Sequence, residues 1–397
     1  MRQPSTRWHD QEPAYCKLLP RPRQIRASRP SVSTTSPGEH KPTYENNEVY
    51  LPNDEIWVYE IESGIWQRQP MKGDLPRPMS GSCAACLNGV MYIFGGYDDL
   101  GYSNELYSVN LQVKNDVFTW KKICNYEGSP PTPRDKLSCW VHKDKLIYFG
   151  GYGCKKINEL NDSFDVNEAS WEEEMFWGWN YDIHVFDPNM NIWYQPIIKG
   201  ISPRPRAAHA CATLGNKGYL FGGRILETRI NDLHCLDLDT WTWSGEITVK
   251  GIRPQGRSWH TLTSVTDDQL FLFGGLSAES QPLSDAWIYS VGISEWRQLE
   301  HCPKNRPRLW HTACLGKEYE VMVFGGSKDD LLSFDSGHCN DVLIFQTQPY
   351  SLFRLCLDCI AKNSTVLQNH LPWLPRQLLS QVEKKITFWV SARRQEK

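Results

Sequence analysis

The sequence lacks long apolar runs and a clear excess of charge of either sign. No apolar stretch approaches the roughly 18 residues of a membrane-spanning helix, and the first residues contain no apolar core of a signal peptide. The 43 basic residues are balanced by 46 acidic ones, for a formal net charge of −3. These absences argue against a membrane protein and against nucleic-acid binding through a general basic field.

Cysteine is present without the spacing of a disulfide framework. There are 13 cysteines, an odd number, and the Cys-x-x-Cys pairs Cys83/Cys86 and Cys356/Cys359 lie far apart in the chain. A zinc site would need such ligands to converge, which nothing in the sequence supports, so we expect no metal and no cofactor. Reduced thiols packed as small apolar side chains indicate a reducing compartment, the cytoplasm or also the nucleus.

What the sequence does contain is many aromatic residues, glycines and prolines between short apolar segments. Aromatic residues make up 12% of the chain, with 17 tryptophans, and this composition favours an all-β protein with many turns. Apolar strands ending in Gly-Gly recur as MYIFGGY, LIYFGGY, YLFGGR, LFLFGGL and VMVFGGS. The first glycines are 55, 72, 52 and 51 residues apart, so the repeat unit has about fifty residues and the second unit a long insertion.

Each unit continues on both sides of the Gly-Gly pair. After it, an Asn, Ser or Asp cluster precedes another strand, as in NDLHCLD, and a tryptophan usually follows on the next strand. Before it, three units open a strand with Arg-x-x-His, in PRAAHA, GRSWHT and PRLWHT. We therefore expect four short strands per unit in one twisted sheet, and several such sheets bury their faces when they are arranged radially.

This pattern resembles the kelch repeat, whose units form the blades of β-propellers. The resemblance implies an all-β, six-bladed type of kelch β-propeller over residues 45–349, with five full repeats and half of a sixth. Residues 53–66 resemble only the outer half of that repeat, because no Gly-Gly stands near residue 43. An open ring and an atypical N-terminus both remain explanations. We expect the basic, Pro- and Ser-rich residues 1–44 to be disordered, with a mitochondrial targeting peptide as the weaker alternative.

The periodicity of the sequence changes after residue 349. One apolar helical face is predicted within residues 351–363, formed at i, i+3, i+4, i+7 and i+8 by Leu352, Leu355, Cys356, Cys359 and Ile360. A second helix is expected after LPWLP, with an apolar stripe of Leu378, Leu379, Val382 and Ile386. Residues 350–392 are therefore assigned to a helical segment and residues 393–397 to a disordered tail. By spacing alone, the helices could form a cap packed on the repeats.

In a propeller, the residues after Gly-Gly and those of the Arg-x-x-His segment recur at one height around the channel. This set contains three cations and no acidic residue. Its members are Tyr97, Lys136, Tyr152, Arg224, nearby Arg229, Ser258, Trp259, Leu276, Leu309, Trp310 and Ser327, and Trp179 of the long insertion could cover them. Such a site suits an anion, a phosphate or better a planar C-terminal carboxylate. The alternative is that the arginines only stack on tryptophan or pair with Glu227.

The segments PRAAHACATLGNKGYLFGGR, GRSWHTLT and PRLWHTAC resemble one kelch subfamily from about Glu45 to Trp389. Its members are substrate receptors of cullin-RING ubiquitin ligases that recognise C-terminal degrons ending in glycine, notably Gly-Gly. The resemblance implies carboxylate binding by Arg224, Arg229 and Ser258. It implies that the pocket walls are formed by Lys136, Tyr152, Trp179 and Trp259.

The tail carries a second resemblance. Leu352-x-x-x-Cys356-x-x-x-Ile360 resembles the BC-box that docks on elongin C, and LPWLPRQLL resembles a cullin box. The implied cullin contacts are Leu374, Pro375 and Leu378, and the implied partners are elongin B/C, a cullin with its RING partner, and substrate proteins ending in glycine. LPWLP is near the cullin 5 form and LPRQL equally fits the cullin 2 form, so the cullin is left open.

Two other classes of protein are alternatives to this assignment. Some kelch propellers are copper oxidases, which need Tyr and His ligands. Tyr97 and Tyr152 lie suitably, but His209, His260 and His311 share one repeat position, which indicates a structural role. We find no nucleophile–base pair and no phosphate loop, so we predict a non-catalytic protein. A plain kelch scaffold would bind a partner without elongin and without regard to a free carboxylate.

Overall fold

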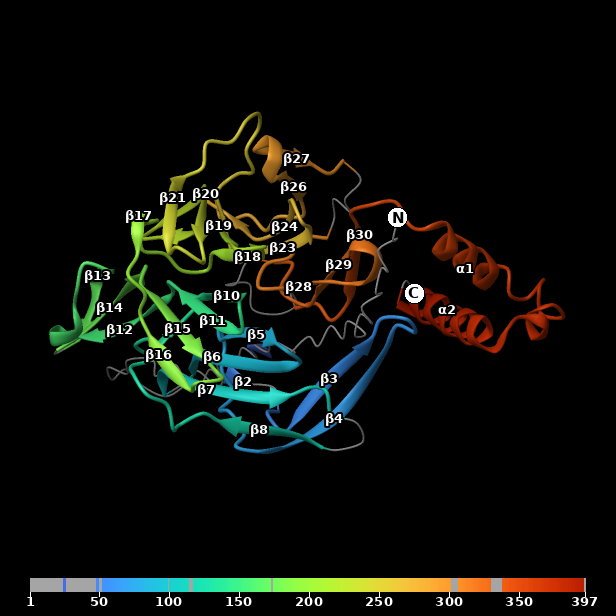
Figure 1. Ribbon diagram of the computed structural model, residues 1–397, viewed down its shortest axis with the longest axis horizontal. Coiled ribbons are helices and arrows are strands. Elements are labelled where there is room, and N and C mark those ends of the chain that lie inside the picture. Colours follow the sequence, from blue (N-terminus) through green and yellow to red (C-terminus); the bar gives the residue numbers. More distant parts are fainter. Residues whose placement is uncertain are drawn as a thin grey trace, which may run out of the picture.

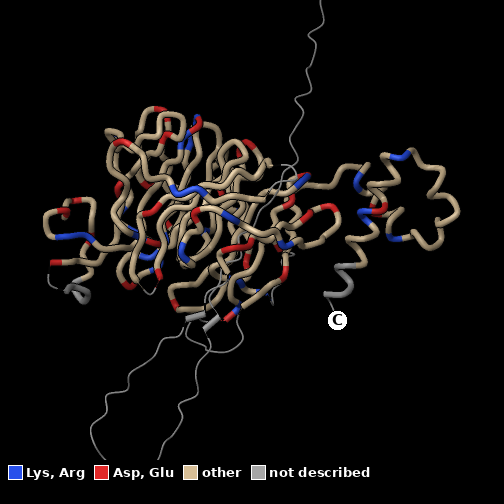
Figure 2. Tube along the Cα trace, turned by 90° about the horizontal axis from the view of Figure 1, so that it is seen from below, with Lys and Arg blue, Asp and Glu red and all other residues tan. Residues whose placement is uncertain are grey.

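The computed structural model describes residues 24–25, 48–49, 52–98, 100–113, 117–172, 174–300, 306–329 and 338–395. These residues form several small β-sheets followed by two C-terminal helices (Figure 1). None of the described helices is long and apolar enough to span a membrane. Basic and acidic residues are interspersed over the sheets (Figure 2), in keeping with the balanced composition.

Five antiparallel sheets correspond to the five Gly-Gly units, and we call them repeat sheets 1 to 5. Sheet 1 contains β5 (Cys83–Leu87), β6 (Val90–Asp98), β7 (Gly101–Asn110) and β8 (Phe118–Lys122). Sheet 2 contains β10 (Ser138–His142), β11 (Lys145–Phe149), β15 (Ile183–Asp187) and β16 (Ile192–Tyr194). Sheet 3 contains β18 (Ala210–Leu214), β19 (Lys217–Ile225), β20 (Thr228–Asp237) and β21 (Thr242–Glu246).

Sheets 4 and 5 complete the series. Sheet 4 contains β23 (Thr261–Thr266), β24 (Gln269–Phe273), β26 (Ala286–Ser290) and β27 (Glu295–Gln298). In the described residues sheet 5 has three strands, β28 (Thr312–Leu315), β29 (Glu320–Phe324) and β30 (Val342–Gln346). The expectation of four strands in every unit is wrong here, because the chain enters a helix six residues after β30 and leaves no length for a fourth strand.

The half repeat forms a hairpin of β3 (Glu55–Glu60) and β4 (Ile65–Gly73). The end of β4 also pairs in parallel with β8 of sheet 1, as β17 (Lys199–Ile201) pairs with β21 of sheet 3. Upstream, β1 (Gln24–Ile25) pairs with β2 (Glu48–Val49). The predicted disorder of residues 1–44 and the missing inner half of this repeat otherwise lie outside the described residues.

Within the residues that the structure describes, the apolar core consists of six clusters, each between two neighbouring units. Four of them join sheets 1 and 2, 2 and 3, 3 and 4, and 4 and 5. The other two place the β3–β4 hairpin between sheet 5, through Tyr59 and Met322, and sheet 1, through Ile56 and Met91. The packing therefore runs through the five sheets and the hairpin in a closed cycle.

The Gly-Gly pairs are required because neighbouring backbone approaches them closely. Gly274 and Gly275 of sheet 4 have φ of +62° and +104°. A Cβ on Gly274 would lie 2.4 Å from the carbonyl oxygen of Arg308 in the next unit, and one on Gly275 would lie 2.7 Å from that of Ser258. A residue with a side chain fits neither the conformation nor the space.

A buried arginine ties together the two halves of four repeats. In sheet 3, Arg206 donates to both carboxylate oxygens of Asp232, at 2.7 and 2.8 Å, and to the carbonyl of Gly222. The same arginine–carboxylate pair recurs as Arg134/Asp182, Arg257/Asp285 and Arg308/Asp341. These pairs were not predicted from the sequence, although both residues stand at fixed positions in the repeat.

The long insertion of the second unit forms a separate sheet. It contains β13 (Phe164–Glu172), β14 (Met175–Asn180), β12 (Tyr152–Lys156) and β9 (Arg134–Asp135), in that order. In Figure 1 this sheet projects from the side of the molecule opposite the C-terminal helices. A smaller counterpart in sheet 4 pairs β22 (Arg257–Ser258) with β25 (Leu276–Ser277).

The C-terminal segment folds into α1 (Leu352–Lys362) and α2 (Arg376–Gln395), with a short 3-10 turn at Leu371–Trp373 between them. The hydroxyl of Ser351 caps α1 by accepting from the backbone N–H of Arg354. Arg354 pairs with the buried Glu320 of sheet 5 at 3.1 Å, and Lys384 of α2 pairs with Glu62 of the β3–β4 turn at 2.7 Å. Both helices project beyond the sheets (Figure 1).

Candidate functional site

The third residue of each Arg-x-x-His segment, and Lys136 at the same place in the Arg-Asp-Lys-Leu segment of the second unit, link neighbouring units. Lys136, Ala208, Trp259 and Trp310 all have φ between 53° and 58°. Each donates its backbone N–H to the carbonyl of the corresponding residue one unit earlier, from Trp310 to Trp259, Ala208, Lys136 and finally Gly81, at 2.8–3.0 Å. This row of hydrogen bonds fixes the four side chains at one level of successive repeats.

The second residue of the segment pairs with the residue that follows Gly-Gly. The bridges are Ser80/Tyr97, Asp135/Tyr152, Ala207/Arg224, Ser258/Leu276 and Leu309/Ser327. The same backbone register therefore recurs in all five units. This confirms the prediction that these positions are equivalent in the repeats.

Arg224 and Arg229 lie directly opposite each other on the hairpin of β19 and β20. Like charges in this arrangement destabilise a sheet. Arg224 relieves part of that repulsion by donating from Nη2 to both carboxylate oxygens of Glu227, at 3.0 Å each, and from Nε to the carbonyl of Leu226 at 2.8 Å. The pairing with Glu227 that the sequence left as an alternative is therefore present.

Arg229 brings sheet 3 into contact with the segment before sheet 4. Its Nε donates to the hydroxyl of the fully buried Ser258 at 3.0 Å. Its guanidinium lies 5.7 Å from the ring centre of Trp259, and Trp259 meets Trp310 edge to face at 5.1 Å. Three residues predicted for the carboxylate and its wall, Arg229, Ser258 and Trp259, thus form one cluster.

The predicted aromatic wall of the second unit forms another cluster. Tyr152 and Trp179 are cross-strand partners on β12 and β14, with ring centres 5.0 Å apart. Trp179 is only 4% exposed, so it lies within the base of the insertion sheet. Tyr102, which the sequence analysis did not single out, packs 6.0 Å from Tyr152, and Asn167 donates to the Tyr152 hydroxyl. In the sequence, this cluster is indicated by the tyrosines that follow Gly-Gly in the first two units, Tyr97 and Tyr152.

Lys136 stands beside these aromatic residues through the Asp135/Tyr152 bridge. Its ammonium group pairs with the buried carboxylate of Asp135 at 2.7 Å. The expected set of positions contained no acid, but two carboxylates are in fact adjacent to it, Asp135 at Lys136 and Glu227 at Arg224. Tyr152 and Trp179 contact each other and Tyr102, whereas Arg224 contacts Leu226 and Glu227, so these residues belong to two separate groups of contacts.

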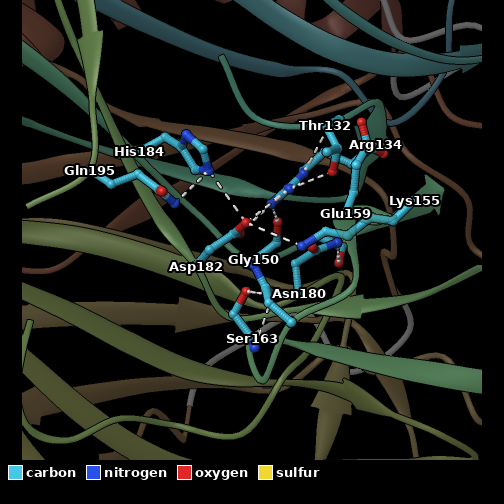
Figure 3. A network of polar contacts seen from close by, with 12 residues as sticks. Thr132, Arg134, Gly150, Lys155, Glu159, Ser163, Asn180, Asp182, His184 and Gln195 are labelled. Carbon is cyan, nitrogen blue, oxygen red and sulfur yellow. Dashed lines mark hydrogen bonds and ion pairs between the residues drawn. The ribbon is translucent and has the colours of Figure 1, made fainter. Parts of the chain in front are cut away.

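The second unit contains a denser network of polar contacts, centred on Asp182 (Figure 3). Asp182 accepts from Arg134, and the ammonium of Lys155 and the ring of His184 lie 3.7 and 3.3 Å from it. These cations hold the pKa of Asp182 far below its usual range despite burial, while burial lowers the pKa of Lys155. Because Lys155 lies on β12, the network anchors this strand, which begins with Tyr152.

The repeated histidines have structural contacts. Nε2 of His209, His260 and His311 contacts Ser138, the Phe221 carbonyl and Thr261, each in the preceding unit. Burial, reinforced by Arg206, lowers the pKa of His209 to about 3, and that of His260 is lowered likewise. In the described part of the chain no three His, Cys, Asp or Glu residues form a metal-binding group. Ten described cysteines are reduced, whereas Cys314 is in a disulfide, which corrects the expectation of uniformly reduced thiols.

The predicted apolar face of α1 points into solvent. Leu352 is 77% exposed, Leu355 and the thiols of Cys356 and Cys359 are exposed, and Ile360 is half-buried. Leu357 and Ala361 provide the buried side of α1 instead. Of the predicted cullin contacts, Pro375 is exposed and Leu374 and Leu378 are half-buried, while Trp373 beside them is 86% exposed. A cap that buries this face against the repeats is therefore not what the chain forms.

The Gly-Gly hairpins, the linked Arg-x-x-His segments and the arginine–carboxylate pairs define a kelch-repeat protein. The KLHDC2/KLHL20/DRC7 Kelch-repeats domain matches residues 43–275 and 179–356, and the chain belongs to this family. No catalytic domain is indicated by the match.

Several curated proteins are similar to the chain over most of its length. Kelch domain-containing protein 1 of Homo sapiens is 66% identical over 353 residues, which are 89% of this chain and 87% of that protein. Kelch domain-containing protein 2 of Bos taurus is 46% identical over 350 residues, 86% of each chain. Host cell factor 2 of Homo sapiens is 30% identical over 291 residues, 66% of this chain and 35% of that protein.

Proposed function

We propose that the chain is a substrate receptor of a cullin-RING ubiquitin ligase that binds C-terminal glycine degrons. In this proposal the five sheets and the β3–β4 hairpin occupy the six positions of a kelch β-propeller. The closed cycle of apolar clusters supports that arrangement. The protein acts by binding and carries out no catalysis itself.

The observation that carries the proposal is the pair of arginines held opposite each other beside Ser258. A planar carboxylate between Arg224 and Arg229 accepts hydrogen bonds from both guanidinium groups and removes their mutual repulsion. Each hydrogen bond to a charged group contributes roughly 1.5–3 kcal/mol. Three such donors, Arg224, Arg229 and Ser258, therefore supply much of the binding free energy of a micromolar complex, which is about −8 kcal/mol.

The aromatic residues explain a preference for glycine at the end of the ligand. Trp259 and Trp310 stand at the third position of neighbouring units, and Tyr152 and Trp179 stand at the second unit. Rings against the last two residues of a peptide leave no room for a Cβ atom, and a misfit methyl group costs about 1–3 kcal/mol. Lys136 is assigned to the backbone of the bound peptide.

The exposed stripe of α1 is the proposed docking face for elongin B/C. Apolar side chains that are exposed side by side on a projecting helix carry an unfavourable free energy that a partner removes. Leu352, Cys356 and Ile360 form the BC-box in this assignment, and Leu374, Pro375 and Leu378 contact the cullin. Both cullin 5 and cullin 2 fit the sequence, so the choice is a matter for binding experiments.

Fluorescence anisotropy with three labelled peptides tests the pocket. The first ends in a free Gly-Gly, the second is its amide, and the third carries one further residue. We expect micromolar binding of the first peptide alone, and a loss of at least about tenfold in Arg229→Ala, since a hydrogen bond to charge is removed. Equal binding of all three peptides would identify the protein as a kelch scaffold that does not recognise a free carboxylate. The Arg224–Glu227 pair favours this alternative.

A further inference from the structure

We propose that Glu227 is an internal competitor for the carboxylate site, which lowers the affinity of every ligand end that contacts Arg224. This inference rests on the proposed function and refines it. Glu227 is 90% exposed, yet both its carboxylate oxygens contact Nη2 of Arg224, whose side chain is 35% exposed. In the free protein, a carboxylate of the chain itself therefore already sits on one of the two arginines.

The local backbone holds Glu227 in this position. Arg224 and Arg229 close the hairpin of β19 and β20, and Leu226 at its tip has a φ of 49°. This turn brings the Leu226 carbonyl to Nε and the Glu227 carboxylate to Nη2 of the same guanidinium. Nε and Nη2 form the edge through which arginine grips a planar carboxylate. A ligand that takes this edge has to displace Glu227.

The second arginine differs in the partner on its Nε. Arg229 donates there to the neutral hydroxyl of Ser258 and stacks on Trp259. A peptide carboxylate that approaches Arg224 has to displace Glu227 from Nη2 and meets its repulsion. Glu227 thus lowers the affinity of every end group that contacts Arg224, and it lowers the affinity of a charged end group further by repulsion.

The test is Glu227→Gln, which keeps the length of the side chain and removes its charge. We expect the labelled free Gly-Gly peptide to bind about two- to fivefold more tightly, since an exposed ion pair is worth at most about 1 kcal/mol. The amidated peptide meets no charge repulsion from Glu227, so it should gain less in proportion, and the preference of the protein for the free carboxylate over the amide should widen. Equal melting temperatures of the two proteins verify that the fold is unchanged.

Glu246→Gln is the matched control. Glu246 forms a similar exposed pair with Arg253 at 2.9 Å, in sheet 3 but outside the cluster, and its substitution should leave peptide binding unchanged. If wild type binds the free peptide and Glu227→Gln binds it no better, this inference is overturned and the proposed function stands. If neither protein distinguishes the free peptide from its amide, the proposed function itself is wrong.

Discussion

At the scale of single residues, the arginine–carboxylate pairs show how buried charge is used in this fold. Arg206 and Arg257 are 0% exposed, and each meets an aspartate with both Nη groups. Asp285 lies directly before the third strand of its repeat, and Asp232 lies within the third strand of its own. The pair therefore joins the segment before the first strand to the far side of the Gly-Gly turn.

Asp285→Ala tests this role against a matched aspartate. The substitution leaves Arg257 buried without its carboxylate, and we expect a loss of about 3–5 kcal/mol in the free energy of unfolding. Asp54 stands at the equivalent place of the half repeat but is exposed to solvent. Asp54→Ala should cost less than about 0.5 kcal/mol in urea titrations. Similar losses in both variants would contradict the account.

The buried histidines make stability depend on pH. The pKa of His209 is about 3 in the folded protein, whereas an unfolded histidine has a pKa of about 6.5. Below pH 6.5, His209 of the unfolded chain therefore binds a proton that His209 of the folded chain does not bind. The stabilising contribution is complete above pH 6.5 and is lost progressively as the pH falls toward 3, by up to about 1.4 kcal/mol per pH unit for each such group.

Urea midpoints between pH 7.5 and 5 measure this effect before the aspartates begin to titrate. His209→Gln retains a polar contact for Ser138 and removes the titrating group, so its slope of stability against pH should be shallower than that of wild type. An unchanged slope in the variant would assign the pH dependence to other groups.

At the scale of elements, the Gly-Gly turn is the feature that fixes each hairpin against its neighbour. Gly274→Ala adds a Cβ 2.4 Å from a carbonyl oxygen at a positive φ, and we expect a cost of about 1–3 kcal/mol or more. Gly292→Ala is the control, because a Cβ there meets nothing within 4 Å. Thermal melting should separate the two variants clearly, and a harmless Gly274→Ala would show that the turn can relax.

The assigned role of the tail helices can also be tested with two variants of α1, one at exposed positions and one at a buried position. Replacing Leu352 and Cys356 by aspartate alters only exposed positions, so stability should change by less than about 0.5 kcal/mol while elongin B/C binding is lost. Leu357→Asp instead places a charge on the buried side of α1 and should unfold the tail. Retention of elongin B/C by the double variant in a pull-down would remove the docking assignment.

At the scale of the whole molecule, the sequence predicts what is local and repeated. The Gly-Gly period revealed five sheets because close backbone contacts force glycine at both positions, and spacing alone located both tail helices. The arginine–aspartate pairs were missed because their members are 26 to 48 residues apart. An amphipathic period also shows that a helix has an apolar face, but not whether anything covers it, and for Leu352 nothing described does.

The candidate site was predictable to the same extent. Repeat position brought Arg229, Ser258 and Trp259 together, because equivalent positions share one backbone register. It did not decide that Glu227 would sit on Arg224, since that contact depends on the turn at Leu226. The three strands of sheet 5 were not predicted, because the repeat pattern does not show that α1 begins where a fourth strand would follow β30.

The most direct test of the account is capture of a peptide by elongin B/C through this chain. Immobilised elongin B/C is incubated with a labelled Gly-Gly peptide in the presence of the wild-type protein. We predict that the peptide is retained, and that retention is lost in Arg224→Ala/Arg229→Ala, in Leu352→Asp/Cys356→Asp, and with the amidated peptide. Retention that persists in the arginine double variant, or no retention of a peptide that the protein binds in solution, would contradict the central claim.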